Sequence, residues 1–217
     1  MEVSVKYLYA AVGWILWCTL HSALISVTVT EYAKRKLGDR FRFYRIFYNV
    51  FSLVTFVPLV AYSVSIRGQP VFRWEGPLVI VRCILVVLSL FLFVAGGWHY
   101  SLFDFFGIRQ VRTKRPSRAL SWADTFVASG IHKVIRHPWY LGGIIIFWTG
   151  TGNLSLSMIL DNLVITSYFI VGTILEERKL VREFGESYRE YQKQVSMLLP
   201  YKWLKASIRR AAQTSKL

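Results

Sequence analysis

The stretch LVIVRCILVVLSLFLFVAGGW, from Leu78 to Trp98, decides the fold class of this 217-residue chain. Arg82 is the only charged residue in it. About 20 consecutive apolar residues are enough for an α-helix to cross the hydrocarbon core of a bilayer. Because lipid offers the backbone no hydrogen-bond partners, a spanning segment of this kind must be helical. The sequence therefore predicts a transmembrane helix here.

Other apolar blocks extend this interpretation to most of the chain. Two precede it, from about Tyr7 to Val29 and from about Tyr44 to Ile66, and a longer one runs from about Tyr140 to Leu175. The last block is too long for one span, so we expect a turn at 151–157, with Asp161-Asn162 as a competing break. We predict an all-α integral membrane protein with five transmembrane helices, of which the fourth is short, tilted or partly re-entrant.

The net charge of +15 is distributed in a way that indicates membrane topology. Segment 30–45 holds six Lys and Arg residues, segment 99–138 holds seven, and the part from Glu176 onward holds ten of the 27 in the chain. Since cytoplasmic segments are enriched in Lys and Arg, we place these three in the cytoplasm and the N-terminus outside. In a bacterium the membrane would be the inner membrane. We expect contact with membrane lipids, no nucleic-acid binding and no obligate protein partner.

The ends of the chain and its two cysteines bear on domain organisation. The first apolar block should remain as a span, because it is longer than the apolar region of a signal peptide and no small-residue cleavage site follows it. Cys18 and Cys83 lie inside predicted spans, so they suggest neither a disulfide framework nor a metal site. We interpret residues 1–206 as a single membrane domain and 207–217 as a basic disordered tail.

The loop from His99 to Arg136 is where functional residues are expected, since long loops in compact domains are usually functional. It is rich in aromatic residues, which favour the membrane interface. We therefore predict interfacial helices that cap a cytoplasmic cofactor pocket. The loop leads into RHPWYLG, residues 136–142. Pro138 suits the first turn of a helix, which puts His137 beside its N-cap, where capping is the alternative to a functional role.

The last apolar block ends in two adjacent carboxylates, Glu176 and Glu177. Carboxylates at a helix C-terminus oppose the helix dipole, so a cation should compensate for them: Arg136, Arg178 or a positively charged ligand. S-adenosylmethionine is such a ligand, because it carries a sulfonium and an ammonium group. Aromatic faces can add cation–π stabilisation, and the sequence offers Tyr140, Tyr188 and Tyr191.

A multi-part pattern covers about residues 124–201. It consists of FVASGIHKVIRHPWYLG at 126–142, Glu176-Glu177, Phe184-Gly185, Tyr188, Tyr191, and Val195 up to Pro200. The pattern resembles the C-terminal signature of the isoprenylcysteine carboxyl methyltransferase superfamily, with one departure: His132 stands where family members usually have Tyr. The resemblance implies an S-adenosylmethionine site in this part of the chain. The cofactor-binding residues would be Val127, His132, His137, Pro138, Tyr140 and Glu176, joined by Tyr188 and Tyr191.

The N-terminal half points to one branch of this superfamily. His21-Ser22 and FDFFGIRQ at 103–110 resemble the NnrU-like and methanethiol S-methyltransferase branch, whose members show an Asp-Leu-Phe-Gly-Leu-Arg-Gln-type segment. The resemblance implies methyl transfer to a small thiol, giving a thioether. Substrate contacts are then expected from His21, His99, Asp104, Arg109 and Gln110, although Asp104 could instead pair structurally with Arg109.

Three residues are candidates for catalysis. A thiol attacks as its thiolate, so a nearby base or cation would favour the reaction, and we assign this role to His21, Arg136 and Glu177. Each has a structural alternative. His21 could be a hydrogen-bonded interhelical histidine, Arg136 could extend to the interface, and Glu177 could pair with a basic neighbour.

Three other functions remain open on the sequence alone. The first is carboxyl methylation of isoprenylcysteine or another lipidic acceptor. The second is an NADPH-dependent membrane reductase, for which Arg112, Lys114 and Arg115 would form a phosphate site. The third is a non-enzymatic transporter or accessory protein, which would bind no adenosyl cofactor.

Overall fold

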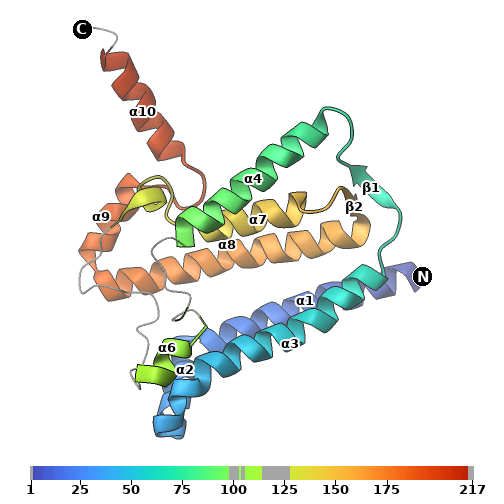
Figure 1. The fold of residues 1–217 in the computed structure, drawn as a ribbon, viewed down its shortest axis with the longest axis horizontal. Coiled ribbons are helices and arrows are strands. Elements are labelled where there is room, and N and C mark those ends of the chain that lie inside the picture. The colour runs from blue at the N-terminus through green and yellow to red at the C-terminus, as the bar shows by residue number, and fades with distance from the viewer. Residues whose placement is uncertain (1, 98–102, 104–105, 114–127, 215–217) are drawn as a thin grey trace. The chain divides into compact units, whose positions relative to one another are not determined.

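The computed structural model describes residues 2–97, 103, 106–113 and 128–214. Its elements are α1 (Glu2–Ile25), α2 (Val27–Leu37), the 3-10 helix η1 (Gly38–Phe43), α3 (Tyr44–Ser65), β1 (Pro70–Arg73), α4 (Leu78–Gly97), α6 (Ile108–Thr113), the 3-10 helix η2 (Gly130–Lys133), α7 (Pro138–Thr149), β2 (Asn153–Ser155), α8 (Leu156–Phe184), α9 (Glu186–Gln194) and α10 (Tyr201–Thr214) (Figure 1). Unit 1 comprises Met1–Leu78, Tyr100–Ala119 and Thr151–Tyr168, and unit 2 comprises Val79–His99, Leu120–Gly150 and Phe169–Leu217.

Four of the described helical segments are long and apolar enough to cross a membrane: Val5–Ile25, Val27–Ser65, Leu78–Gly97 and Leu156–Phe184. The second contains α2, η1 and α3, and its apolar part is α3. A mostly helical, multi-pass membrane protein is therefore confirmed. The predicted fourth span corresponds to α7, which has only 12 residues and covers roughly 18 Å at 1.5 Å per residue. That is shorter than the hydrocarbon core, so five full-length spans are not found in the described part of the chain.

The turn expected at 151–157 is confirmed. Helix α7 ends at Thr149 and α8 begins at Leu156, whereas Asp161 and Asn162 lie inside α8. The segment between the two helices contains β2, which pairs antiparallel with β1 through Phe72 and Leu154. This small ribbon was not predicted. Its strands have three and four residues, too few for an alternating pattern to stand out.

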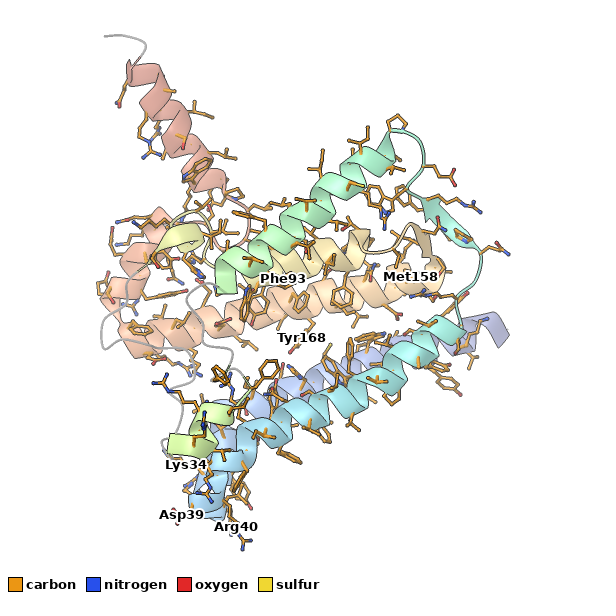
Figure 2. The ribbon with its side chains drawn as sticks, viewed as in Figure 1. Lys34, Asp39, Arg40, Phe93, Met158 and Tyr168 are labelled. Carbon is orange, nitrogen blue, oxygen red and sulfur yellow. The ribbon has the colours of Figure 1, made fainter. Side chains whose placement is uncertain are left out.

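In unit 1, α1 and α3 run side by side in opposite directions (Figure 1). The indole N–H of Trp14 donates to Ser63 Oγ at 3.0 Å, and that of Trp17 donates to Thr55 Oγ1 at 3.1 Å. These bonds join polar groups between spans, where an unpaired donor would be costly. Basic side chains gather at the turn from α2 into η1, where Lys34 and Arg40 are labelled in Figure 2. This turn belongs to segment 30–45, one of the three basic segments that the sequence predicts to be cytoplasmic.

In unit 2, α7 lies antiparallel to α4 along its whole length. Trp139 Nε1 donates to the carbonyl of Phe93 at 2.9 Å, Ser89 Oγ donates to the carbonyl of Gly142 at 2.8 Å, and Arg82 Nε donates to the carbonyl of Thr149 at 2.8 Å. Small residues permit this close approach between membrane helices.

Gly96→Ala is expected to lower the stability of unit 2 by ~1–3 kcal/mol, the usual cost of overpacking. A Cβ at residue 96 would lie 2.7 Å from Trp139 Cδ1 and 2.8 Å from Pro138 Cγ, so the start of α7 would have to move. The measurement is the thermal unfolding midpoint in detergent. Gly152→Ala is the control, because a Cβ there meets nothing within 4 Å. Equal midpoints for both variants would contradict this packing.

The C-terminal part is more helical than we expected. Helix α8 continues to Phe184, and Gly185 then adopts a φ of 59°, a left-handed conformation that favours glycine. Helix α9 follows and carries surface ion pairs, with Lys193 3.0 Å from Glu190. The prediction that disorder begins at Ser207 is wrong, since α10 extends from Tyr201 to Thr214.

Candidate functional site

Arg136 and Glu177 form a buried ion pair at the centre of the polar cluster in unit 2. Arg136 Nε and Nη2 donate to the two oxygens of Glu177 at 2.8 and 2.7 Å. Each side chain is 8% exposed. Arg136 Nη1 donates to the carbonyls of Gln192 and Val195. The guanidinium therefore uses four of its five N–H groups within the protein and does not extend to the interface.

Glu177 also accepts hydrogen bonds from three other side chains. His137 Nε2 lies 2.6 Å and Tyr188 OH lies 2.8 Å from its Oε1, and Gln192 Nε2 donates to its Oε2. A carboxylate offers about four lone-pair sites, and the five donors around Glu177 fill them. This geometry favours a positioning role for Arg136 and Glu177 over the direct catalytic role that we expected. It also supplies the predicted cation beside the carboxylate pair, and that cation is Arg136.

Tyr188 completes this cluster through its bond to Glu177. It is 1% exposed, and its ring lies 5.6 Å from that of Tyr191 in an edge-on arrangement. Burial, and then the hydrogen bond to the Glu177 carboxylate, raise the pKa of Tyr188 above its ordinary value. The phenol therefore remains protonated and keeps donating its hydrogen bond.

Backbone contacts hold the start of α7 against the segment after α9. The amides of Arg136 and His137 donate to the carbonyls of Ser196 and Met197 at 2.9 and 3.1 Å, and Ile135 and Ser196 form a parallel bridge. Pro138 is at the first helical turn, as predicted. His137 is the N-cap residue, but its side chain makes no capping hydrogen bond. Its ring faces the two glutamates instead, so simple capping does not account for it.

Glu176 differs from its neighbour in being accessible. Its side chain is 19% exposed, and Oε2 lies 3.6 Å from His137 Nδ1. The ring of Tyr140 lies 5.6 Å from that of His137. A half-buried carboxylate with spare lone pairs near an aromatic ring suits a cationic ligand, whereas the lone pairs of the adjacent Glu177 are taken by its five donors.

The structure places the remaining predicted cofactor residues near this cluster or outside the described part. The Nδ1 of His132 donates to the carbonyl of Arg136 at 3.2 Å, and Tyr191 OH donates to the carbonyl of His132. Val127 lies outside the described residues. Gln192 was missed by the sequence analysis. Its signal was weak: it is four residues after Tyr188 and so shares the same helical face.

A second polar cluster lies in unit 1 around His21. Its Nε2 is 2.5 Å from Tyr48 OH and its Nδ1 is 3.1 Å from Ser52 Oγ. The ring of Trp17 stacks on the imidazole with centroids 4.8 Å apart, and the ring of Tyr168 lies edge-on at 6.4 Å. Tyr168 extends from α8 (Figure 2). We did not predict these partners, although Tyr48 and Ser52 share one face of a helix at i, i+4 spacing.

Other predicted substrate residues divide into two groups. His99 and Asp104 lie outside the described residues. Arg109 and Gln110 lie on α6, with Arg109 exposed and Gln110 buried. Gly107 brings α6 against the start of α3, because its φ is 83° and a Cβ there would lie 3.0 Å from Arg45 Cβ. Lys114 and Arg115 of the suggested phosphate site also lie outside the described residues.

The curated relatives of this chain are methyltransferases by name. The chain is 40% identical over 101 residues to a methanethiol S-methyltransferase of Pseudomonas deceptionensis, covering 46% of this chain and 37% of that protein. It is 34% identical over 105 residues to one of Mycobacterium tuberculosis (46% and 40%). It is 38% identical over 78 residues to a protein-S-isoprenylcysteine O-methyltransferase of Schizosaccharomyces pombe (34% and 32%).

The curated relatives match only part of this chain, whereas the family model matches most of it. The chain spans well under half the length of the curated relatives it matches. No solved structure matches the chain significantly. The family model described as "NnrU protein" matches residues 9–199, which include most of the first membrane span, both polar clusters and the start of α7. The chain therefore belongs to the NnrU protein family.

Proposed function

We propose that the chain is a membrane methyltransferase that uses S-adenosylmethionine and methylates a small thiol. The observation that carries the proposal is the arrangement in unit 2, where an accessible Glu176 and Tyr140 flank His137, and His137 is bonded to the buried Arg136–Glu177 pair. These are the positions at which the superfamily signature implies cofactor contacts. The names of the relatives support the same reaction class.

In the proposed site each residue has a defined task. Glu176 pairs with a positive group of the cofactor, and Tyr140 and Tyr191 offer aromatic faces. His137 is held by Glu177, and Glu177 is held by Arg136, Tyr188 and Gln192. Bound S-adenosylmethionine supplies an electrophilic methyl group on a sulfonium. The acceptor sulfur would take this methyl group, with S-adenosylhomocysteine as the leaving group.

The thiol acceptor is proposed to bind at the His21 cluster. A polar side chain within a membrane span is costly and often functional, and here an imidazole, two phenols and Ser52 gather at one place. His21 can take the thiol proton, since the thiolate is the nucleophile. Tyr48 fixes the orientation of the ring. Trp17 stacks on the imidazole and limits the access of water.

The topology proposed for this enzyme retains five crossings. Helix α7 runs back along α4, from the contact of Trp139 with Phe93 to the contact of Thr149 with Arg82. A short antiparallel pass of this kind supports one further crossing beyond the four long segments. The N-terminus is then outside and the C-terminus cytoplasmic, in agreement with the positions of the basic segments.

The test of the proposal is calorimetric titration of the purified protein with S-adenosylmethionine and, separately, with NADPH. Saturable binding of the first alone is expected, followed by release of a methylated thioether into the headspace when methanethiol is added. Binding of NADPH alone would replace the proposal with the reductase. Carboxyl methylation of farnesylcysteine without thiol methylation would favour the activity named for the fission-yeast relative.

Glu176→Gln is expected to weaken S-adenosylmethionine binding about tenfold or more, because a charge-assisted contact is worth about 1.5–3 kcal/mol and 1.4 kcal/mol is tenfold in affinity. The unfolding midpoint should stay close to that of the parent, since Glu176 is half-buried and its contact with His137, at 3.6 Å, is longer than the hydrogen bonds that hold Glu177. Titration calorimetry gives the affinity. Glu183→Gln, an exposed residue of the same helix, is the matched control. Unchanged affinity for Glu176→Gln would remove this residue from the site.

A further inference from the structure

Helix α10 has an apolar face that no other described part of the chain covers. From Trp203 to Gln213, every residue except Ser207 is exposed. Tyr201, Leu204 and Ile208 are 60%, 48% and 68% exposed. Their spacing of three and four residues places them on one side of the helix, so the exposed apolar residues form a continuous stripe.

The face of α10 next to the apolar stripe is basic. Lys205 and Arg209 are four residues apart and exposed, and neither has an ion-pair partner among the described residues. Lys202 is anchored instead, since its Nζ donates to the carbonyl of Gln192 at 2.6 Å and its amide donates to Ser196 Oγ at 3.0 Å. Residues 201–217 contain no Asp or Glu. The helix is therefore strongly basic as well as amphipathic.

A helix of this length needs a surface to stabilise it. It has 14 residues, and isolated helices of about that length are marginal in water. Its first turn is hydrogen-bonded to the rest of unit 2 through Lys202. An amphipathic helix with basic residues beside its apolar stripe suits the boundary between the headgroups and acyl chains of an anionic membrane.

We propose that α10 docks on the anionic lipid surface of the membrane that the chain spans. Leu204 and Ile208 enter the acyl boundary, and Lys205 and Arg209 pair with lipid phosphates. Nucleic acid would satisfy the basic residues but would leave the apolar stripe uncovered. The bonds of Lys202 fix where the helix begins. The lipid surface stabilises the turns that follow. This inference does not depend on the methyltransferase proposal.

The experiment is hydrogen exchange of the full-length protein in lipid nanodiscs, read by mass spectrometry over residues 201–214. Amides of α10 should exchange about tenfold more slowly in discs containing phosphatidylglycerol than in discs of phosphatidylcholine, since each basic residue near an anionic surface adds favourable energy. Added salt should reduce the difference. Exchange over α9 is the internal control, because that helix has its own ion pairs and should not respond to the lipid.

A charge-reversed variant completes the test. Lys205→Glu with Arg209→Glu should abolish the extra protection and leave the unfolding midpoint unchanged, since both side chains are exposed. Equal protection in the two lipids, or protection that survives charge reversal, would overturn the proposal. Protection in neutral detergent as strong as that in the phosphatidylglycerol discs would also overturn the proposal. It would assign the apolar stripe to a second copy or another segment of the chain.

Discussion

Glu177→Ala is expected to destabilise the protein by ~3–5 kcal/mol, the usual cost of removing one partner of a buried ion pair. Arg136 is 8% exposed, so its charge would remain in the interior without a counterion. His137, Tyr188 and Gln192 would each lose a hydrogen-bond acceptor at the same time. The start of α7, α8 and α9 would lose the group that joins them. Equilibrium unfolding in mixed micelles measures the effect.

The control for this prediction is an exposed carboxylate of the same region. Glu186 lies 3.3 Å from Arg189, and their side chains are 71% and 59% exposed, so Glu186→Ala should cost no more than about 1 kcal/mol. A double-mutant cycle of Arg136→Ala and Glu177→Ala should show strong non-additivity, because the two groups share one network. If Glu177→Ala matched Glu186→Ala, the buried network would not stabilise the fold.

The membrane spans could be predicted because their signal is continuous in the sequence. The predicted blocks from Tyr44 to Ile66 and from Leu78 to Trp98 coincide with α3 and α4 to within a residue or two. Helix α7 could not be placed as clearly, since its length is set by the loop and β2 that follow, not by its own composition. The β1–β2 ribbon depends on pairing across about 80 residues of chain, for which the short strands carry no local signal.

The polar cluster of unit 2 was predicted in its members but not in their roles. The adjacent glutamates looked equivalent in sequence, yet Glu177 is buried among five donors and Glu176 is accessible. One residue along a helix rotates the side chain by about 100°, and only the surrounding structure decides which side faces inward. Gln192 and the carbonyl of Val195 escaped notice for the same reason. Their contribution depends on how α9 and the following segment pack.

At the C-terminus, the sequence analysis predicted a disordered tail where the structure has a helix, α10. Segment 201–214 has a helical spacing of Leu204 and Ile208, but its many basic residues favoured a solvated tail. A charged segment near a membrane can gain stability from the lipid surface, which composition alone does not reveal. In this segment, the spacing of Leu204 and Ile208 was therefore the signal in the sequence that favoured a helix over a tail.

His21→Ala is expected to lower the rate of thiol methylation about 100-fold or more, because a positioned acid or base contributes typically 10²–10⁴-fold. Affinity for S-adenosylmethionine should stay within about twofold, since His21 is proposed to act on the thiol and none of the proposed cofactor contacts is removed. Tyr48→Phe removes the partner of Nε2 and should cost about tenfold, which corresponds to one hydrogen bond. Headspace assay of the thioether and titration calorimetry give the two quantities separately.

The matched control lies on the same helix. The hydroxyl of Thr19 is exposed and donates to the carbonyl of Ile15 in its own helix at 2.7 Å, so Thr19→Ala should leave turnover within about twofold. A structural role for His21 would instead lower the unfolding midpoint and the affinity for both ligands together. Loss of turnover at constant cofactor affinity and constant stability separates the two roles. Normal turnover in His21→Ala would remove the imidazole from the reaction. It would not bear on the stabilising role of the buried Arg136–Glu177 pair, because the unfolding experiment on Glu177→Ala does not depend on the methyl acceptor.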